Sequence, residues 1–228
     1  LVQEAKEKKI LYRDQIFLAE SARLYPVDIS ETFAAKGDLD IRFRAIKPSD
    51  EEAMRRLFYR FSNTAIYRRF LFPISTMPHD KIQEYVNVDY SRVMSVVALT
   101  GDPDQETIIA EARFVKDDHS AYGELAFIVD EKFQGRGIAT YLYKMLVRLA
   151  QERGLKGFTA EVLPDNQEMM KVFEKGDLPI NVRVKNGLYL LTIPFAEQQY
   201  AASGEALCCY VVVYILSGVK RFPGLASI

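Results

Sequence analysis

The residues best suited to chemistry lie in a loop that contains two glycines, Gln134-Gly135-Arg136-Gly137-Ile138-Ala139. An apolar stretch, Leu125 to Val129, precedes this glycine loop, and apolar residues at helical spacing follow it. Glycines let a backbone approach a ligand closely, and the first amides of a helix have no partner inside the helix. Those amides, the helix dipole and the Arg136 charge favour a bound anion. The loop therefore predicts an anion site, and the alternative is a plain strand–turn–helix cap.

The spacing of this loop excludes two familiar phosphate-binding motifs. The dinucleotide fingerprint requires glycine or alanine three positions after Gly137, and Thr140 stands there. The phosphate loop of nucleoside triphosphatases requires Gly-Lys-Ser or Gly-Lys-Thr, and neither occurs here. Another class of anion must therefore be considered.

The elements that position the loop can be predicted from periodicity and turn residues. Alternating apolar and polar residues predict strands, and apolar residues at helical spacing predict helices. In chain order we expect a strand at 41–46, helices after Pro48 and after Pro78, strands at 93–99, 107–115 and 122–129, a helix at 137–153, a strand at 158–163, a helix at 166–175 and a hairpin over 177–193 that turns at Asn186-Gly187. This order predicts an α+β or mixed α/β fold, with helices flanking one mostly antiparallel sheet.

The two ends of the chain differ in character from this central part. Residues 1–24 predict a charged helix that ends before Tyr25-Pro26, because proline disfavours helix for the residue before it. Residues 26–39 are expected to be a linker. In the C-terminal extension, 196–228, the apolar run from Ala206 to Leu216 could add an edge strand, pack on the domain or form an interface. The division expected is 1–39, 40–195 and 196–228.

The spacing of Gln134, Gly137 and Ala139, between a strand and a helix, resembles the acyl-CoA motif of the GNAT superfamily of N-acyltransferases. The resemblance covers about residues 40–195. Within the superfamily the chain looks most like the bacterial Pat-type protein lysine acetyltransferases, and also like GNAT domains fused to acetyl-CoA hydrolase/CoA-transferase proteins. Tyr67-Arg68-Arg69-Phe70 and Gly123 to Phe127 carry this closer likeness. Residues 1–39 could be the remnant of a preceding CoA-transferase domain, which is then a possible partner domain.

This resemblance implies direct transfer of an acetyl group from acetyl-CoA to an amine, without a metal. Two strands would splay apart and hold the pantetheine arm between them, and loop amides would hold the pyrophosphate. Amides that polarise the thioester oxygen would act as an oxyanion hole. The cofactor-binding residues that it implies are Phe127, Ile128, Val129, Gln134, Gly135, Arg136, Gly137, Ile138, Ala139, Thr140 and Asn166. For Asn166 the alternative is that it caps its own helix.

Glu124 occupies the position of the catalytic glutamate in Pat-like enzymes. A lysine amine, with a pKa of about 10.4, arrives protonated, so a general base is required. A partly apolar cleft would raise the pKa of Glu124 toward neutrality. The alternatives are that Glu124 is an inert strand carboxylate, or that Glu111 on the preceding strand is the base. Many members have a tyrosine near the leaving sulfur, where this chain has Phe173, so the thiolate would be protonated through solvent.

Composition excludes several classes of protein. The 30 Lys and Arg residues nearly balance the 31 Asp and Glu residues, which argues against a dedicated nucleic-acid binder. The two cysteines are adjacent and the two histidines are far apart, so neither a disulfide framework nor a metal site is expected. The longest apolar run, Ala206 to Leu216, is shorter than the roughly 20 residues that span a bilayer, so no membrane association is expected. The default compartment is the cytoplasm.

The function expected is that of an acetyl-CoA-dependent N-acetyltransferase acting on a protein lysine. A small-molecule amine is an alternative acceptor. A second class is a non-catalytic acetyl-CoA-sensing module of a larger CoA-metabolising protein, which Phe173 and the possible CoA-transferase remnant favour. A third is an interaction domain with a degenerate loop, which the intact Gln134, Gly135, Arg136 and Gly137 disfavour.

Overall fold

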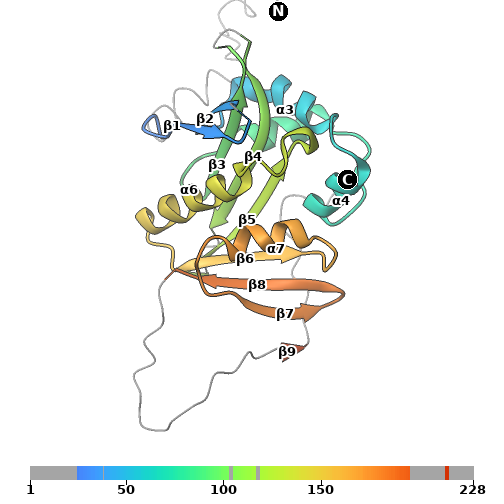
Figure 1. The fold of residues 1–228 in the computed structure, drawn as a ribbon, viewed down its shortest axis with the longest axis vertical. Coiled ribbons are helices and arrows are strands. Elements are labelled where there is room, and N and C mark those ends of the chain that lie inside the picture. Colours follow the sequence, from blue (N-terminus) through green and yellow to red (C-terminus); the bar gives the residue numbers. More distant parts are fainter. Residues whose placement is uncertain (1–24, 38, 103–104, 117–118, 196–213, 216–228) are drawn as a thin grey trace, which may run out of the picture.

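A computed structural model describes residues 25–37, 39–102, 105–116, 119–195 and 214–215. Over these residues the protein is a mixed α/β fold with a single nine-stranded sheet in the order β1-β2-β3-β4-β5-β6-β8-β7-β9 (Figure 1). The strands are β1 (Ser30–Ala35), β2 (Leu39–Ala45), β3 (Val93–Thr100), β4 (Thr107–Lys116), β5 (Tyr122–Val129), β6 (Gly157–Val162), β7 (Asn181–Lys185), β8 (Leu188–Pro194) and β9 (Tyr214–Ile215). The helices are η1 (Pro48–Asp50), α3 (Glu51–Phe58), α4 (Asn63–Phe70), α5 (His79–Val86), η3 (Glu131–Phe133), α6 (Ile138–Glu152) and α7 (Gln167–Glu174).

The sheet consists of two halves that meet at β5 and β6. Strands β1 to β5 pair in antiparallel order, and β6, β8 and β7 form a second antiparallel group. β5 and β6 run parallel and pair only where residues 122–124 lie opposite 157–159. Beyond that point the strands of the two halves run in clearly different directions (Figure 1). The predicted fold class, a mostly antiparallel splayed sheet flanked by helices, is confirmed.

Helices cover both faces of the β1–β5 half. Phe127 on β5 contacts Tyr143 of α6 and Phe173 of α7. Ile128, the next residue, pairs with Glu111 on β4, and the Glu111 side chain contacts Tyr85 of α5. Because successive strand residues point to opposite faces, α6 and α7 cover one face and α5 covers the other.

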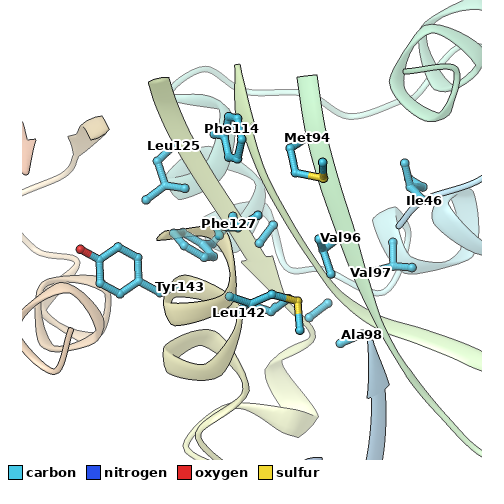
Figure 2. Packing of buried hydrophobic residues seen from close by; sticks show 14 of the residues in the cluster. Ile46, Met94, Val96, Val97, Ala98, Phe114, Leu125, Phe127, Leu142 and Tyr143 are labelled. Carbon is cyan, nitrogen blue, oxygen red and sulfur yellow. The ribbon is translucent and has the colours of Figure 1, made fainter. Parts of the chain in front are cut away.

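Helix α6 forms where the apolar spacing of the sequence predicts it. Its expected apolar face is buried: Ile138, Leu142, Met145, Leu146 and Leu149. Figure 2 shows the Leu142 side chain lying among residues of the sheet, including Val96 and Phe127. This burial fixes the helix against the sheet, so that its N-terminal end lies at the glycine loop.

The linker predicted for residues 26–39 is wrong, because it contains strand β1. Ser30 to Ala35 pair antiparallel with Leu39 to Arg44 around a turn at Gly37, whose φ is 85°. Sequence alternation is weak in β1, since Phe33 is its one large apolar residue. A third helix, α4, also lies between the two that were predicted, and the Ser62 hydroxyl caps it by accepting from the Ala65 amide at 3.1 Å.

The chain ends are described only in part. The predicted helix at 1–24 and the adjacent cysteines Cys208-Cys209 lie outside the described residues. Of the apolar run from Ala206 to Leu216, Tyr214 and Ile215 form β9 and pair parallel with Arg183 and Val184 of β7, which is the edge-strand alternative. In the described part of the chain no helix is long and apolar enough to cross a membrane, and no cluster of three or more His, Cys, Asp or Glu could hold a metal.

Candidate active site

A cleft of about 350 Å³ opens where β5 and β6 stop pairing. It is lined by residues of both strands, of the glycine loop, of α4 and of α7. Predicted site residues that line it are Phe127, Ile128, Val129, Gln134, Gly135, Gly137, Ile138, Ala139, Thr140 and Asn166. Glu124 and Arg136 adjoin the cleft through neighbouring residues that line it. The fold therefore gathers the predicted residues at one site.

The glycine loop is shaped by backbone conformations that favour glycine. Gly135 and Gly137 have φ values of 74° and 91°, in the left-handed region that other residues rarely adopt. Gly137 is the N-cap residue of α6, and its carbonyl accepts from the Tyr141 amide at 3.0 Å. The Gln134 side-chain amide donates to the Val129 carbonyl at 3.1 Å and ties the loop to the end of β5. The first-turn amides of α6 are thus presented at the cleft, as an anion site requires.

The Arg136 side chain is turned toward the β1–β2 hairpin. Its Nη1 donates to the Lys36 carbonyl at 3.1 Å, and its guanidinium lies 5.9 Å from the centre of the Phe133 ring. The positive charge expected at the anion site is therefore held at the outer side of the loop. The Arg136 backbone remains part of the loop between the two glycines.

Strand β1 also supports the start of α6. A Cβ placed on Gly137 would lie 3.6 Å from the Phe33 ring. Phe33 stacks on Tyr141 of α6 with ring centres 4.6 Å apart, and the Tyr141 hydroxyl donates to Glu31 at 2.7 Å. The hairpin that the sequence did not predict is thus a direct neighbour of the glycine loop.

The Phe127 end of the cleft is aromatic. Phe173 is 1% exposed and packs against Phe127 and Tyr143, with ring centres 6.2 and 5.4 Å away. At the position where many GNAT members have tyrosine, this chain therefore has a buried phenylalanine ring without a hydroxyl group. At the start of α7, the Asn166 Oδ1 accepts from the Met169 amide at 3.3 Å. The capping alternative for Asn166 is what the structure shows, although the residue also lines the cleft.

Glu124 is half-buried on β5 and has an unusual pKa. It lies opposite Thr159 of β6, at the last pair before the two strands diverge. Burial and the negative charge of Glu161 raise the pKa of Glu124 to about 7, and the Arg69 charge opposes this rise. A carboxyl group with such a pKa can accept a proton near neutral pH.

Glu111, the alternative base, is fully buried in a network of polar side chains. Ser95 Oγ and Arg113 Nε both donate to its Oε1 at 2.6 Å, and the Tyr85 hydroxyl donates to its Oε2 at 2.6 Å. Burial raises the pKa of Glu111, but the charges of Arg113 and Arg69, together with the hydrogen bonds from Ser95 and Tyr85, leave the pKa below its usual value. Its lone pairs are engaged, so Glu111 is poorly placed to accept a proton from an amine.

Sequence reasoning did not assign three charged residues to the site. Two of them belong to Tyr67-Arg68-Arg69-Phe70, in which Tyr67 is 44% exposed. Arg68 and Arg69, however, line the cleft, and Arg68 reaches across to Asp165 at 3.3 Å. Glu161 also lines the cleft. Thr159 pairs with Glu124, and Glu161 lies two residues further along β6, so both side chains point to the same face of the sheet. This spacing of two residues is the sequence signal that could have placed Glu161 near Glu124.

A model of the acetyltransferase (GNAT) family matches residues 62–176, which is just over half of the chain (115 of 228 residues). The chain belongs to the GNAT family of acetyltransferases. The matched range of this GNAT domain includes α4, Glu124, the glycine loop and α7. The GNAT motif inferred from the loop is thus part of a match that extends over the whole cleft.

Two curated relatives are similar to this GNAT chain. Acetyltransferase Pat of Mycolicibacterium smegmatis is 35% identical over 134 residues, which is 58% of this chain and 39% of Pat. Acetyltransferase PA5475 of Pseudomonas aeruginosa is 22% identical over 116 residues, which is 51% of this chain and 62% of that protein. The chain therefore spans less than two thirds of the length of either relative.

Solved structures show the same GNAT fold. The crystal structure of the GNAT domain of S. lividans PAT superposes with a TM-score of 0.67 at 25% identity, over 75% of this chain and 99% of that one. A cAMP-binding acyltransferase from Mycobacterium smegmatis gives a TM-score of 0.53 at 26% identity, over 84% of this chain and 56% of that one. The predicted GNAT membership and the likeness to Pat are confirmed.

Proposed function

We propose that this chain is an acetyl-CoA-dependent N-acetyltransferase that acetylates a protein lysine, with Glu124 as the general base. The observation that carries the proposal is a half-buried carboxyl group with a pKa of about 7, beside a cleft that ends in a glycine loop. The choice of a protein as acceptor is supported by the resemblance to Pat-type protein lysine acetyltransferases, and the chain is similar to Pat. Acceptors of other kinds, such as a small amine, use the same chemistry.

Acetyl-CoA fits the residues that line the cleft. Amides of residues 135–140 would hold the pyrophosphate, since the first turn of α6 has donors without partners inside the helix. Residues 127–129 of β5 line the cleft beyond the loop and would meet the pantetheine arm and the thioester. Asn166 would contact the same arm from the α7 side. The charge of Arg136 would act on the pyrophosphate only from the outer side of the loop.

The transfer itself needs one base and one polarised thioester carbonyl. Ionised Glu124 takes the proton from the lysine ammonium, directly or through a water molecule. The neutral amine then attacks the carbonyl carbon and a C–N bond forms. The attacking nitrogen loses its second proton to solvent, and the C–S bond breaks as CoA leaves as a thiolate. The CoA thiolate, with an ordinary thiol pKa of about 8.5, is protonated through solvent, because Phe173 offers no proton. Glu124 returns its proton to solvent and is ready for the next acceptor.

Binding of acetyl-CoA is the first test of this function. Calorimetry on the wild-type protein is expected to give a micromolar dissociation constant that Gly137→Trp abolishes. Tryptophan rarely adopts the φ of 91° at this position, and its side chain would press on Phe33, so the loop would be distorted. Gly154→Trp is the matched control. Gly154 lies beyond the other end of α6 with a comparable φ of 73° and open space around it. A folded wild-type protein that does not bind acetyl-CoA would contradict the proposed function.

A second function is favoured by Phe173. A module that senses acetyl-CoA without transferring the acetyl group has no need of a proton donor beside the sulfur. Such a module binds acetyl-CoA and loses binding in Gly137→Trp, but shows no turnover with any amine. The cytoplasmic location and the division at residues 39 and 195 stay predictions.

A further inference from the structure

Arg69 is a cation in the wall of the cleft that the mechanism so far does not use. It lies in the last turn of α4. Its Nη2 donates to the Tyr85 hydroxyl at 3.0 Å, so the guanidinium is held from one side. Its Nε is buried and has no hydrogen-bond partner among the residues that the structure describes. Arg69 itself lines the cleft.

A buried network anchors Arg69 from behind. The Tyr85 hydroxyl that accepts from Arg69 in turn donates to Glu111 at 2.6 Å. Glu111 also accepts from Ser95 and Arg113, and the Arg113 guanidinium lies 3.4 Å from the centre of the Tyr85 ring. These side chains come from α4, α5, β3 and β4, so the network fixes the guanidinium to the sheet rather than to its own helix.

The charges of this network leave one positive charge in excess. Glu111 is held in its ionised form, because the charges of Arg113 and Arg69 and the hydrogen bonds from Ser95 and Tyr85 together lower its pKa despite burial. Arg113 pairs with Glu111 and balances its charge, and Arg69 lines the cleft with its charge unbalanced within this network. The register of β4 and β5 pairs Glu111, Arg113 and Val115 with Ile128, Ala126 and Glu124, respectively. Glu124 therefore points to the same face as the network, and its pKa is lowered by Arg69 against burial and Glu161.

We propose that Arg69 is a positioning residue for acetyl transfer: anchored by Tyr85 and Glu111, its guanidinium favours the ionised carboxylate of Glu124 on the acceptor side of the cleft. The proposal rests on the proposed role of Glu124 as the base. An ionised carboxylate is the form that can accept the proton of an ammonium group. The excess positive charge keeps a larger share of the enzyme in that form at neutral pH.

The test measures the ionisation of Glu124 without any need for turnover. The side-chain carboxyl carbons of ¹³C-glutamate-labelled protein are titrated by NMR, and the Glu124 signal is assigned by its loss in Glu124→Gln. Arg69→Gln is expected to raise the pKa of Glu124 by about half a unit or more, because it removes a nearby opposite charge. Arg69→Lys keeps a charge and is expected to restore most of the wild-type value. Arg68→Gln is the matched control, because Arg68 pairs with Asp165 and Glu168, and no shift is expected.

Tyr85→Phe removes the hydroxyl that holds Arg69 but keeps the charge of Arg69. Without the hydroxyl that holds Arg69, the pKa of Glu124 is expected to rise, while the double variant with Arg69→Gln shifts no further than Arg69→Gln alone. An unchanged Glu124 pKa in Arg69→Gln, or an equal shift in Arg68→Gln, would overturn the proposal.

A kinetic measurement distinguishes this proposal from the proposed function. With a peptide that contains one lysine, the acidic limb of kcat/KM against pH is expected to move in Arg69→Gln by the same amount as the NMR titration. Absence of turnover at every pH in the wild type would contradict the proposed function, and the NMR titration would still decide the role of Arg69.

Discussion

Three effects from different elements determine the pKa of the Glu124 carboxyl group. Burial on β5 and the charge of Glu161 on β6 raise its pKa to about 7, and Arg69 on α4 lowers it. A carboxyl group with such a pKa exists in both forms near neutral pH, and the ionised form is the one in which Glu124 can act as a base. The rate of transfer is therefore expected to rise as the pH increases through about 7.

Glu161 provides a direct test of this electrostatic balance. Glu161→Gln removes a negative charge beside Glu124, so the pKa of Glu124 is expected to fall and the acidic limb of kcat/KM to move to lower pH. Lys185 lies near Glu161 and partly offsets its charge, so the movement should be well below that expected for a bare pair of carboxylates. Glu168→Gln, which removes a charge that faces Arg68, is the control. A limb that stays in place or moves to higher pH in Glu161→Gln is the contrary result.

At the scale of elements, the site depends on the end of β5, on the glycine loop and on the junction between the two halves of the sheet. Gln134 ties the loop to β5, and Arg136 and Phe33 tie it to the β1–β2 hairpin. The sheet divides at the short pairing of β5 with β6, where Gly157 lies opposite Tyr122. The cleft exists because this pairing stops after residue 124.

Gly157 is expected to be essential for this junction. A Cβ on Gly157 would lie 2.5 Å from the Ile193 carbonyl oxygen and would also clash with the Tyr122 ring. Because one of these atoms belongs to the backbone, Gly157→Ala is expected to destabilise the fold by about 1–3 kcal/mol. Thermal unfolding measures the effect. Gly187→Asn, at an open turn position where asparagine tolerates the positive φ of 75°, should leave the midpoint nearly unchanged. Equal midpoints for the two variants would refute this account of the junction.

Elements with a strong local signal could be predicted from the sequence. The apolar spacing of α6 and the turn at Asn186-Gly187 both predicted what the structure contains. Strand β1 could not be predicted, because it is stabilised by pairing with β2 and by the contact of Phe33 with Tyr141 rather than by its own pattern. The cleft positions of Arg69 and Glu161 depend on how α4 and β6 pack, and no short stretch of sequence contains that information.

At the scale of the whole molecule, the two halves of the sheet diverge (Figure 1). Residues of β5 and β6, one strand from each half, line the same cleft. Arg68 of α4 reaches Asp165 and Glu168 at the start of α7, and so connects elements on either side of the cleft. The family match extends over this same region. Under the proposed mechanism, the acceptor amine approaches the thioester near Glu124.

The central claim is that Glu124 is the general base, and the rate of acetyl transfer by Glu124→Gln tests it most directly. The amide keeps the shape of the side chain but cannot accept the proton. With a single-lysine peptide, kcat is expected to fall by about 10²–10⁴-fold, while the acetyl-CoA dissociation constant measured by calorimetry stays at the wild-type value. A Glu124→Gln variant that transfers acetyl groups at the wild-type rate would contradict the account.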